Sequence, residues 1–190
     1  MVSSIELIQA ISKALKAVTP PPVVLDPVMI SKSGYRLLNQ DAQDALIHHL
    51  FPLSEVVTPN IYEAEALIDK KIETLEEMKR AAQDILKLGA KKVVVKGGHL
   101  GEKVATDVLF DGLEFKALES RRIQTKNTHG TGCTFSSAIA ANIASGKTFF
   151  EAVTLAKAYI TGAIEHSLSI GQGHGPTHHF FDLYAKAGIK

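Results

Sequence analysis

Residues 74–98 read TLEEMKRAAQDILKLGAKKVVVKGG, and this stretch decides the fold. Its first half predicts a helix over Leu75–Leu88, capped by Thr74 and ended by Gly89. Its second half, Lys92–Lys96, is a short β-branched run that predicts a buried strand. A helix that leads directly into a buried strand is typical of α/β proteins with a parallel sheet.

The same pattern recurs upstream of this stretch. Apolar runs at Val23–Leu25 and Val56–Val57 predict two more buried strands. Periodicity and capping residues predict three further helices: Ile5–Val18 capped by Ser3 or Ser4, Asp41–Leu50 capped by Asp41, and Ile61–Ile68. Three buried strands separated by helices indicate a mostly parallel sheet with helices on both faces.

Downstream, the pattern predicts an antiparallel edge and then helices. Val104–Phe110 and Leu113–Leu118 flank Asp111-Gly112, a dipeptide that strongly signals a two-residue hairpin. A helix rich in small residues follows Cys133, a second helix runs from Phe149 to about residue 166, and a loop rich in glycine and histidine comes last. With no repeat or linker, residues 1–190 are expected to form one α/β domain.

Composition narrows the classes of partner. The 190 residues are 45% hydrophobic and 22% charged, which is typical of a soluble globular domain. The net charge is +1, from 21 basic and 20 acidic residues. The two signs of charge are interspersed along the chain, so nucleic acids and anionic membranes are not expected partners. The single cysteine excludes an internal disulfide. Residues 1–17 do not resemble a signal peptide, because charged residues interrupt their apolar pattern. We therefore expect a cytoplasmic protein. The apolar stretches fall far short of the roughly 20 residues of a membrane span.

Polar residues and glycines follow each of the three buried strands. Asp26 follows the first, Thr58 and Asn60 follow the second, and Lys96–Gly98 end the third. Ligands of open parallel sheets bind at the carboxyl ends of the strands, so we expect these residues to converge on one crevice.

Two acidic positions suit a divalent cation. Asp26 could present a carboxylate to phosphate-bound magnesium, although it could equally be a turn-former. Asn60 and Glu63 stand three residues apart at a helix start and could hold a hard cation or its waters between them. The alternative is that Asn60 is an N-cap and Glu63 its capping-box partner.

Lys96 ends an apolar strand and precedes two glycines that would let a ligand approach the backbone. A cation there could neutralise phosphate charge during transfer. The alternative is a lysine that simply extends to solvent from a strand end.

The run Asn127–Cys133, NTHGTGC, joins a glycine-punctuated turn to a helix start. Backbone N–H groups and the positive end of the helix dipole favour an anion such as phosphate there. Cys133 could act as a base toward an attacking hydroxyl, or it could be a small apolar packing residue.

Three histidines, His174, His178 and His179, lie in the C-terminal glycine-rich loop. They could bind a transition metal, but their spacing does not favour a particular metal site. A structural loop or a lid over the substrate is the better interpretation.

Six separated segments resemble one family, the hydroxymethylpyrimidine and phosphomethylpyrimidine kinases of thiamine biosynthesis, which belong to the ribokinase-like superfamily. The matching segments, in the family's order, are LDPVM at 25–29, SKSG at 31–34, VTPNIYEA at 57–64, VKGGH at 95–99, TKNTHGTGC at 125–133 and GHGP at 173–176.

The resemblance implies transfer of the γ-phosphoryl group of ATP to 4-amino-5-hydroxymethyl-2-methylpyrimidine and then to its monophosphate. It implies that Gly130, Thr131 and Gly132 form an anion hole and that Cys133 stands where most relatives of the superfamily hold an aspartate base. It assigns the remaining roles as follows: ATP binding to Asp26, Thr58, Asn60, Glu63, Lys96 and Gly98; magnesium to Asp26 and Glu63 through phosphate or water; the transferred charge to Lys96; and pyrimidine contacts to Met1, Val28 and Cys133.

The resemblance also implies that the family's first strand and glycine-rich substrate loop, about a third of the protein, precede the position of Met1. We therefore expect an unprotected sheet edge and impaired activity of these 190 residues. Two other functions are retained: a pyridoxal kinase, because some vitamin B6 kinases share Gly-Thr-Gly-Cys, and a non-catalytic nucleotide-binding fragment. The family usually forms dimers, so a homodimer is expected.

Overall fold

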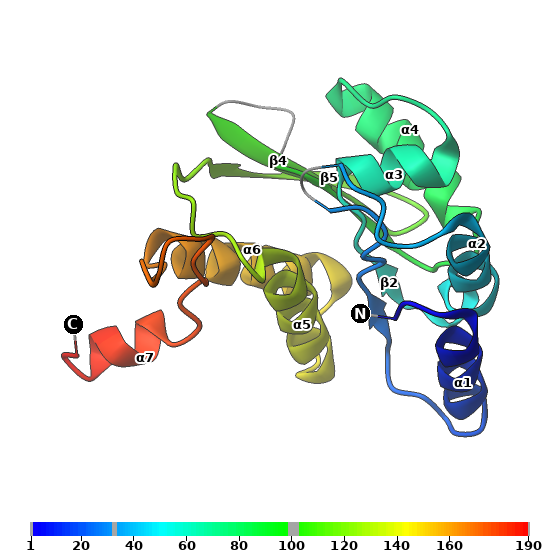
Figure 1. The fold of residues 1–190 in the computed structure, drawn as a ribbon, viewed down its shortest axis with the longest axis horizontal. Helices are drawn as coiled ribbons and strands as arrows, with labels where there is room; N and C mark the ends of the chain where they lie inside the picture. Colours follow the sequence, from blue (N-terminus) through cyan, green and yellow to red (C-terminus); the bar gives the residue numbers. More distant parts are fainter. Residues whose placement is uncertain (1, 32–33, 99–102, 190) are drawn as a thin grey trace. The chain divides into compact units, whose positions relative to one another are not determined.

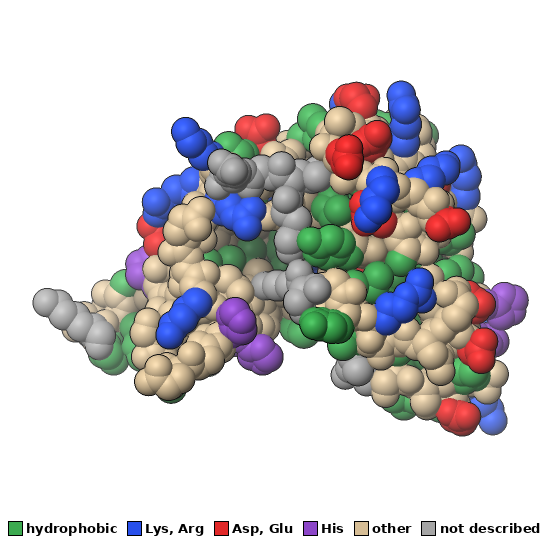
Figure 2. Space-filling view, turned by 45° about the horizontal axis from the view of Figure 1, so that its top comes forward, with side chains coloured by type: hydrophobic (Ala, Val, Ile, Leu, Met, Phe, Trp, Pro, Cys, Tyr) green, Lys and Arg blue, Asp and Glu red, His purple; other side chains and the backbone are tan. Residues whose placement is uncertain are grey.

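The computed structural model describes residues 2–31, 34–98 and 103–189. The chain divides into two compact units, Met1–Glu119 and Ser120–Lys190, and the elements of each are labelled in Figure 1. Basic and acidic side chains of the described residues are interspersed over the face shown in Figure 2. No helix among the described residues has the length and apolar character needed to cross a membrane.

The first unit contains a mixed sheet whose strands lie in the order β1-β2-β3-β4-β5. Its elements, in chain order, are α1 (Ile5–Lys16), β1 (Val24–Leu25), α2 (Gln40–His49), the 3-10 helix η1 (Phe51–Leu53), β2 (Val56–Val57), α3 (Ile61–Ile68), α4 (Leu75–Leu86), β3 (Val93–Gly97), β4 (Val104–Phe110) and β5 (Phe115–Arg121). The last two residues of β5 already belong to the second unit.

The pairing of the strands confirms a parallel sheet with an antiparallel edge. β1 pairs with β2 in parallel through Leu25 and Val57, and β2 pairs with β3 in parallel through Val57 and Val93. β4 runs antiparallel to β3, from the pair Val93–Phe110 to the pair Gly97–Thr106. The carboxyl ends of β1, β2 and β3 therefore lie at the same edge of the sheet.

Helix α4 explains why residues 74–98 form one packed unit. Its buried side chains, Met78, Ala81, Ala82 and Ile85, recur at the spacing of one helical face. They share a hydrophobic cluster with Val93 and Val95 of β3. Burial of a side chain the size of Met78 or Ile85 contributes about 1.5–3 kcal/mol, so this contact anchors the helix to the sheet.

The N-cap residues predicted from the sequence are correct for two helices and wrong for a third. Thr74 and Glu77 form a capping box at the start of α4, and Ser4 accepts from Leu7 N–H at the start of α1. For α2, however, the predicted cap Asp41 is wrong. Asn39 Oδ1 accepts from Ala42 N–H at 2.8 Å, so the helix begins at Gln40.

The predicted hairpin after β4 is present, because β4 and β5 are neighbouring strands, but its expected two-residue loop is wrong: residues 111–114 separate the two strands. Asp111 Oδ1 accepts from the N–H groups of Leu113 and Glu114, at 2.9 and 2.8 Å. Those two donors are therefore not available to pair the strands, and β5 begins only at Phe115. The aspartate widens the turn that the dipeptide signal treats as tight.

The second unit contains α5 (Thr131–Ala144), α6 (Phe149–Glu165) and α7 (Phe181–Lys186). α5 and α6 pack against each other, and α6 buries Ala152, Ala156 and Ala163 along one face. α7 was not predicted, because six residues with no buried side chain carry no periodic signal. It lies against α6 where the Phe181 ring approaches Gly162: a Cβ atom there would come within 2.5 Å of that ring.

Candidate functional site

Three strand ends of the first unit meet at one point. Lys96, in β3, donates from Nζ to Asp26 Oδ1 at 2.8 Å, and Asp26 directly follows β1. Thr58, which directly follows β2, donates from Oγ1 to the same carboxylate oxygen at 3.3 Å. The register of the parallel strands therefore brings together a cation, a carboxylate and a hydroxyl that are far apart in the sequence.

This ion pair is largely withdrawn from water. The side chains of Asp26 and Lys96 are 12% and 18% exposed, and Thr58 is fully buried. Backbone bonds hold the residues in place, because Thr58 N donates to Leu25 O and Lys96 N donates to Pro59 O. Since removing two charges from water costs about as much as their attraction returns, stability alone does not explain the pair.

Glu63 has both carboxylate oxygens occupied by backbone donors. Its Oε2 accepts from Asn60 N at 2.8 Å, and Asn60 Oδ1 accepts from Glu63 N at 3.0 Å, which completes a capping box at the start of α3. Its Oε1 accepts from Met29 N at 3.1 Å. Glu63 thus ties the segment after β1 to α3, a contact that the sequence pattern did not indicate.

Glu63 also interacts electrostatically with Lys96. Burial raises the pKa of the Glu63 carboxyl above its ordinary value, because only 2% of the residue is exposed. The positive charge of Lys96 and the N–H donor of Asn60 oppose this rise, whereas the negative charge of Asp26 adds to it. Asp26, Glu63 and Lys96 therefore form one electrostatic group.

The raised pKa of Glu63 predicts that the difference in thermal stability between the unchanged chain and the Glu63→Gln variant depends on pH. The folded protein binds this proton more readily than the unfolded chain. Binding of this proton stabilises the fold fully below the ordinary glutamate pKa of about 4, and this stabilisation is lost as pH rises through the raised pKa that Glu63 has in the folded protein. We expect the Tm of the unchanged chain, minus that of the variant, to fall from pH 4 to pH 7. Thermal unfolding by circular dichroism measures it, and a difference that grows with pH would contradict the assignment.

Val28 has an unusual backbone conformation next to this group. Its φ is +44°, a left-handed value that is rare for a β-branched residue. The neighbouring Met29 N–H is held by Glu63, which helps to keep the strained residue in place. Such strain concentrates near functional sites, and a pyrimidine contact of Val28 stays a prediction. The other residue predicted to contact the pyrimidine, Met1, lies outside the described residues.

The two glycines after Lys96 differ in what surrounds them. A Cβ atom on Gly97 would lie 1.9 Å from Thr106 O, so the close approach of β4 requires glycine there. Gly97 N also donates to Asp107 Oδ1 at 3.0 Å. A Cβ atom on Gly98 would meet no atom of the described residues within 4 Å. Of the two positions predicted to let a ligand approach, Gly98 is therefore the open one.

This difference predicts opposite outcomes for two alanine variants. Gly97→Ala should destabilise the fold by roughly 3 kcal/mol, the upper end of typical overpacking costs, because the obstructing atom is backbone. Gly98→Ala should change stability by less than about 0.5 kcal/mol. Urea unfolding of the two variants measures both values. Equal losses would show that the surroundings of Gly97 and Gly98 do not differ as described.

The glycine-punctuated turn begins a helix in the second unit. Gly130 is the N-cap of α5 with a φ of +79°, and Cys133 stands in the first turn. Thr134 Oγ1 donates to Gly130 O at 2.8 Å, and Thr131 Oγ1 donates to Thr128 O at 2.7 Å. The first N–H groups of a helix have no acceptor within it, so Gly132 and Cys133 can offer theirs to an anion.

Cys133 is exposed, which disfavours its alternative role as a buried packing residue. It belongs, with the rest of the Gly130 turn, to the second unit. That this turn forms one site with Asp26 and Lys96 stays a prediction.

The three C-terminal histidines make separate local contacts. His174 Nδ1 bonds with Lys126 O, His178 Nδ1 accepts from Phe180 N, and His179 Nε2 bonds with Thr134 Oγ1, at 2.9, 3.3 and 2.9 Å. Among the described residues, no group of three or more potential side-chain ligands is placed to hold a metal ion. These contacts favour the structural-loop interpretation.

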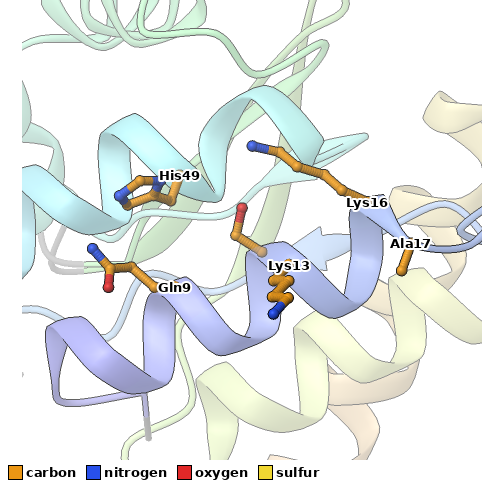
Figure 3. Close-up of a pocket in the computed structure, with 6 residues that line it drawn as sticks. Gln9, Lys13, Lys16, Ala17 and His49 are labelled. Atoms are coloured by element: carbon orange, nitrogen blue, oxygen red, sulfur yellow. The ribbon is translucent and has the colours of Figure 1, made fainter.

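A pocket of about 450 Å³ lies between α1 and α2 (Figure 3). Its lining residues are Gln9, Ser12, Lys13, Lys16, Ala17 and His49. None of the predicted site residues that the structure describes lines it, and its two lysines are exposed on the surface of α1. The chemistry therefore points to the strand ends and to the Gly130 turn rather than to this pocket.

Known proteins that are similar to this chain include kinases with two different named activities. The chain matches the phosphomethylpyrimidine kinase family over residues 1–178. It is 50% identical over 183 residues to the hydroxymethylpyrimidine/phosphomethylpyrimidine kinase of Rhizobium meliloti, covering 95% of this chain and 68% of that protein. It is 48% identical over 179 residues to the thiamine biosynthesis bifunctional protein ThiED of Geobacter sulfurreducens, covering 94% of this chain but only 36% of that protein. An ADP complex of Bacillus subtilis pyridoxal kinase superposes with a TM-score of 0.88 at 41% identity, covering 95% of this chain and 68% of that one.

Proposed function

The chain belongs to the phosphomethylpyrimidine kinase family, and from this membership we propose that it transfers the γ-phosphoryl group of ATP. The proposed acceptors are 4-amino-5-hydroxymethyl-2-methylpyrimidine and its monophosphate, the latter giving the diphosphate, in thiamine biosynthesis. The names of the two curated relatives support this substrate class. The chain spans 68% of one of these relatives and 36% of the other, and the activity of the whole protein is brought to it as a proposal.

One observation carries the proposal: the Asp26–Lys96 ion pair stands with Thr58 at the carboxyl ends of three parallel strands. This is the edge at which open α/β sheets bind ligands. A lysine held by a carboxylate provides a positioned positive charge, and phosphoryl transfer depends mainly on positioning and charge neutralisation. Lys96 would neutralise charge on the transferred group.

The turn that begins α5 would provide the remaining chemistry. The thiolate of Cys133 would take the proton of the substrate hydroxyl as that oxygen attacks the γ-phosphorus, and ADP would leave. Gly130, Thr131 and Gly132 would form the anion hole for the transferred phosphoryl oxygens. Because Thr131 N already donates to Thr128 O at 3.4 Å, the N–H groups of Gly132 and Cys133 would be the ones that stabilise the charge. The exposure of Cys133 supports this role, because a base must reach its substrate.

The nucleotide and magnesium are assigned to the first unit. Magnesium, when bound with ATP, would neutralise phosphate charge, and it prefers carboxylate and phosphate oxygens. Asp26 fits such a ligand, whereas both oxygens of Glu63 already accept backbone N–H groups. Glu63 would therefore act through the segments that it holds or through water. The proposed nucleotide contacts are Asp26, Thr58, Asn60, Glu63, Lys96 and Gly98.

A second candidate function is a pyridoxal kinase. The similarity to the Bacillus subtilis pyridoxal kinase structure favours it, and that structure is an ADP complex, which also supports ATP as the phosphoryl donor. Val28 and Met1 are the proposed contacts with the ring of the acceptor in either case. We further propose that both units form one ribokinase-like domain and that the protein is a cytoplasmic homodimer.

The test is to incubate the chain with ATP and magnesium and with either alcohol, and to follow ADP and the phosphorylated product. The Rhizobium meliloti kinase serves as the positive control. We expect the hydroxymethyl pyrimidine to be consumed faster than pyridoxal, and the reverse preference would favour the second candidate. Calorimetric binding of ATP without turnover, with the control active, would instead identify a nucleotide-binding fragment. Light scattering tests the dimer.

A further inference from the structure

Two segments of the second unit are joined immediately before the Gly130 turn. His129 forms a parallel bridge with Pro176, and His129 N donates to Gly175 O at 3.1 Å. Leu168 N donates to Pro176 O at 3.2 Å, which closes the loop on itself. The loop between α6 and α7 therefore lies along residues 127–129.

The Asn127 side chain is the centre of this junction. The residue is 4% exposed, and its Oδ1 accepts from Gly175 N at 3.1 Å. Its Nδ2 donates to Ser169 Oγ at 3.1 Å. One buried amide thus binds the loop at two points, six residues apart in the sequence.

Gly175 shows how closely the segments approach. A Cβ atom at this position would lie 2.4 Å from Asn127 Oδ1 and 2.5 Å from Leu168 O. Only glycine allows the amide to reach the loop backbone at this distance. The loop sequence and Asn127 are therefore matched to each other.

The C-terminal end of this loop also contacts the helix that the turn begins. Thr134 Oγ1 donates to Gly130 O and bonds with His179 Nε2 at 2.9 Å. Tyr159 of α6 donates to His179 O at 2.9 Å, which fixes this histidine in turn. The Gly130 turn is thus held on both sides by residues 168–179.

We propose that Asn127 is a positioning residue: by tying residues 127–129 to the Ser169–Gly175 loop, it fixes the orientation of the Gly130 turn and of the first turn of α5. The inference rests on the proposed function, in which that turn stabilises the transferred phosphoryl group. Asn127 does not contact the substrate in this scheme. It acts because backbone donors stabilise a developing charge only when they are held in the right geometry.

Hydrogen–deuterium exchange of Asn127→Ala tests the junction without any substrate. Loss of two buried hydrogen bonds should speed exchange by about tenfold in residues 128–134 and 168–177. Exchange in the central turns of α6 should not change. The matched control is Asn142→Ala, because that amide bonds to Ala138 O and Ala152 O in the same unit. Unchanged exchange in the two segments, or an equal increase throughout the unit, would overturn the proposal.

Asn127→Asp separates positioning from simple destabilisation. The aspartate retains an acceptor for Gly175 N–H, and the Ser169 hydroxyl can turn to donate to its second oxygen. We expect Asn127→Ala to lower kcat about tenfold or more while the KM for ATP stays within about twofold, and Asn127→Asp to recover most of the loss. Equal losses in both variants would refute positioning by the amide. Absence of turnover in the unchanged chain would count against the proposed function alone, because the exchange measurement needs no turnover.

Discussion

Replacing Lys96 with Met should lower kcat by about 10²–10³-fold, the range for removing one group that stabilises a transition state. The physical reason is the position of Nζ, 2.8 Å from Asp26 Oδ1 at the strand ends, where its charge is poorly screened by water. Steady-state kinetics with ATP and the hydroxymethyl pyrimidine measure the loss.

The matched control is Lys92→Met, four residues earlier in the same run. Lys92 is paired with Glu55, and its side chain is 28% exposed. It precedes β3, at the end of that strand opposite to Lys96, so we expect kcat to stay within about twofold of the unchanged value. A similar loss in both variants would show that stability, not the position of the charge, controls the rate.

A double variant separates the charge from the fold. Lys96→Met leaves Asp26 unpaired in a mostly buried place and should cost about 3 kcal/mol of stability. Adding Asp26→Asn removes the unpaired charge, so most of that stability should return while activity stays low. Recovery of activity together with stability would remove the proposed role of Lys96.

Replacing Cys133 with Ala should lower kcat by about 10²-fold or more, the usual contribution of a general base. The affinity for ATP should change much less, because the thiol is assigned to the acceptor hydroxyl rather than to the nucleotide. The residue is exposed, so little stability should be lost with it. Kinetics and calorimetry with ATP measure the two effects separately.

Cys133→Ser is the matched variant, because it keeps the size of the side chain and replaces a thiol by a much weaker acid. A base at this position predicts that both Ala and Ser variants lose turnover. A residue that only fills space predicts that Ser retains it. Equal losses of turnover and ATP binding in the Ala variant would also argue against the base.

Local signals in the sequence placed most elements accurately. The bounds of α3 and β4 match the expected segments, Thr74 caps the helix it was expected to cap, and Asn60 is the N-cap that was the alternative to a cation ligand. These features depend on residues within about four positions of each other, such as the Asn60–Glu63 capping box. One error occurred where two nearby polar residues, Asn39 and Asp41, compete for the cap of α2.

The partners of the candidate site residues could not be predicted in this way. The sequence left Glu63 with two interpretations, a cation ligand and a capping-box partner, and only the folded chain brings Met29 N–H to its second oxygen across 34 positions. Asn127 carried no signal of its own, because its partner Gly175 lies 48 positions away. Asp107 likewise binds Gly97 only through the register of an antiparallel pair.

The sequence by itself determined the alternation of helices and strands and the residue types that follow each strand: a carboxylate, a hydroxyl and a lysine. Only the tertiary structure decided that Lys96 pairs with Asp26 across 70 positions and that Thr58 joins the same oxygen. The physical reason is that periodicity and capping act within a few residues, whereas these contacts depend on the register of β1, β2 and β3. A change of register by one residue would point each of these side chains to the other face of the sheet.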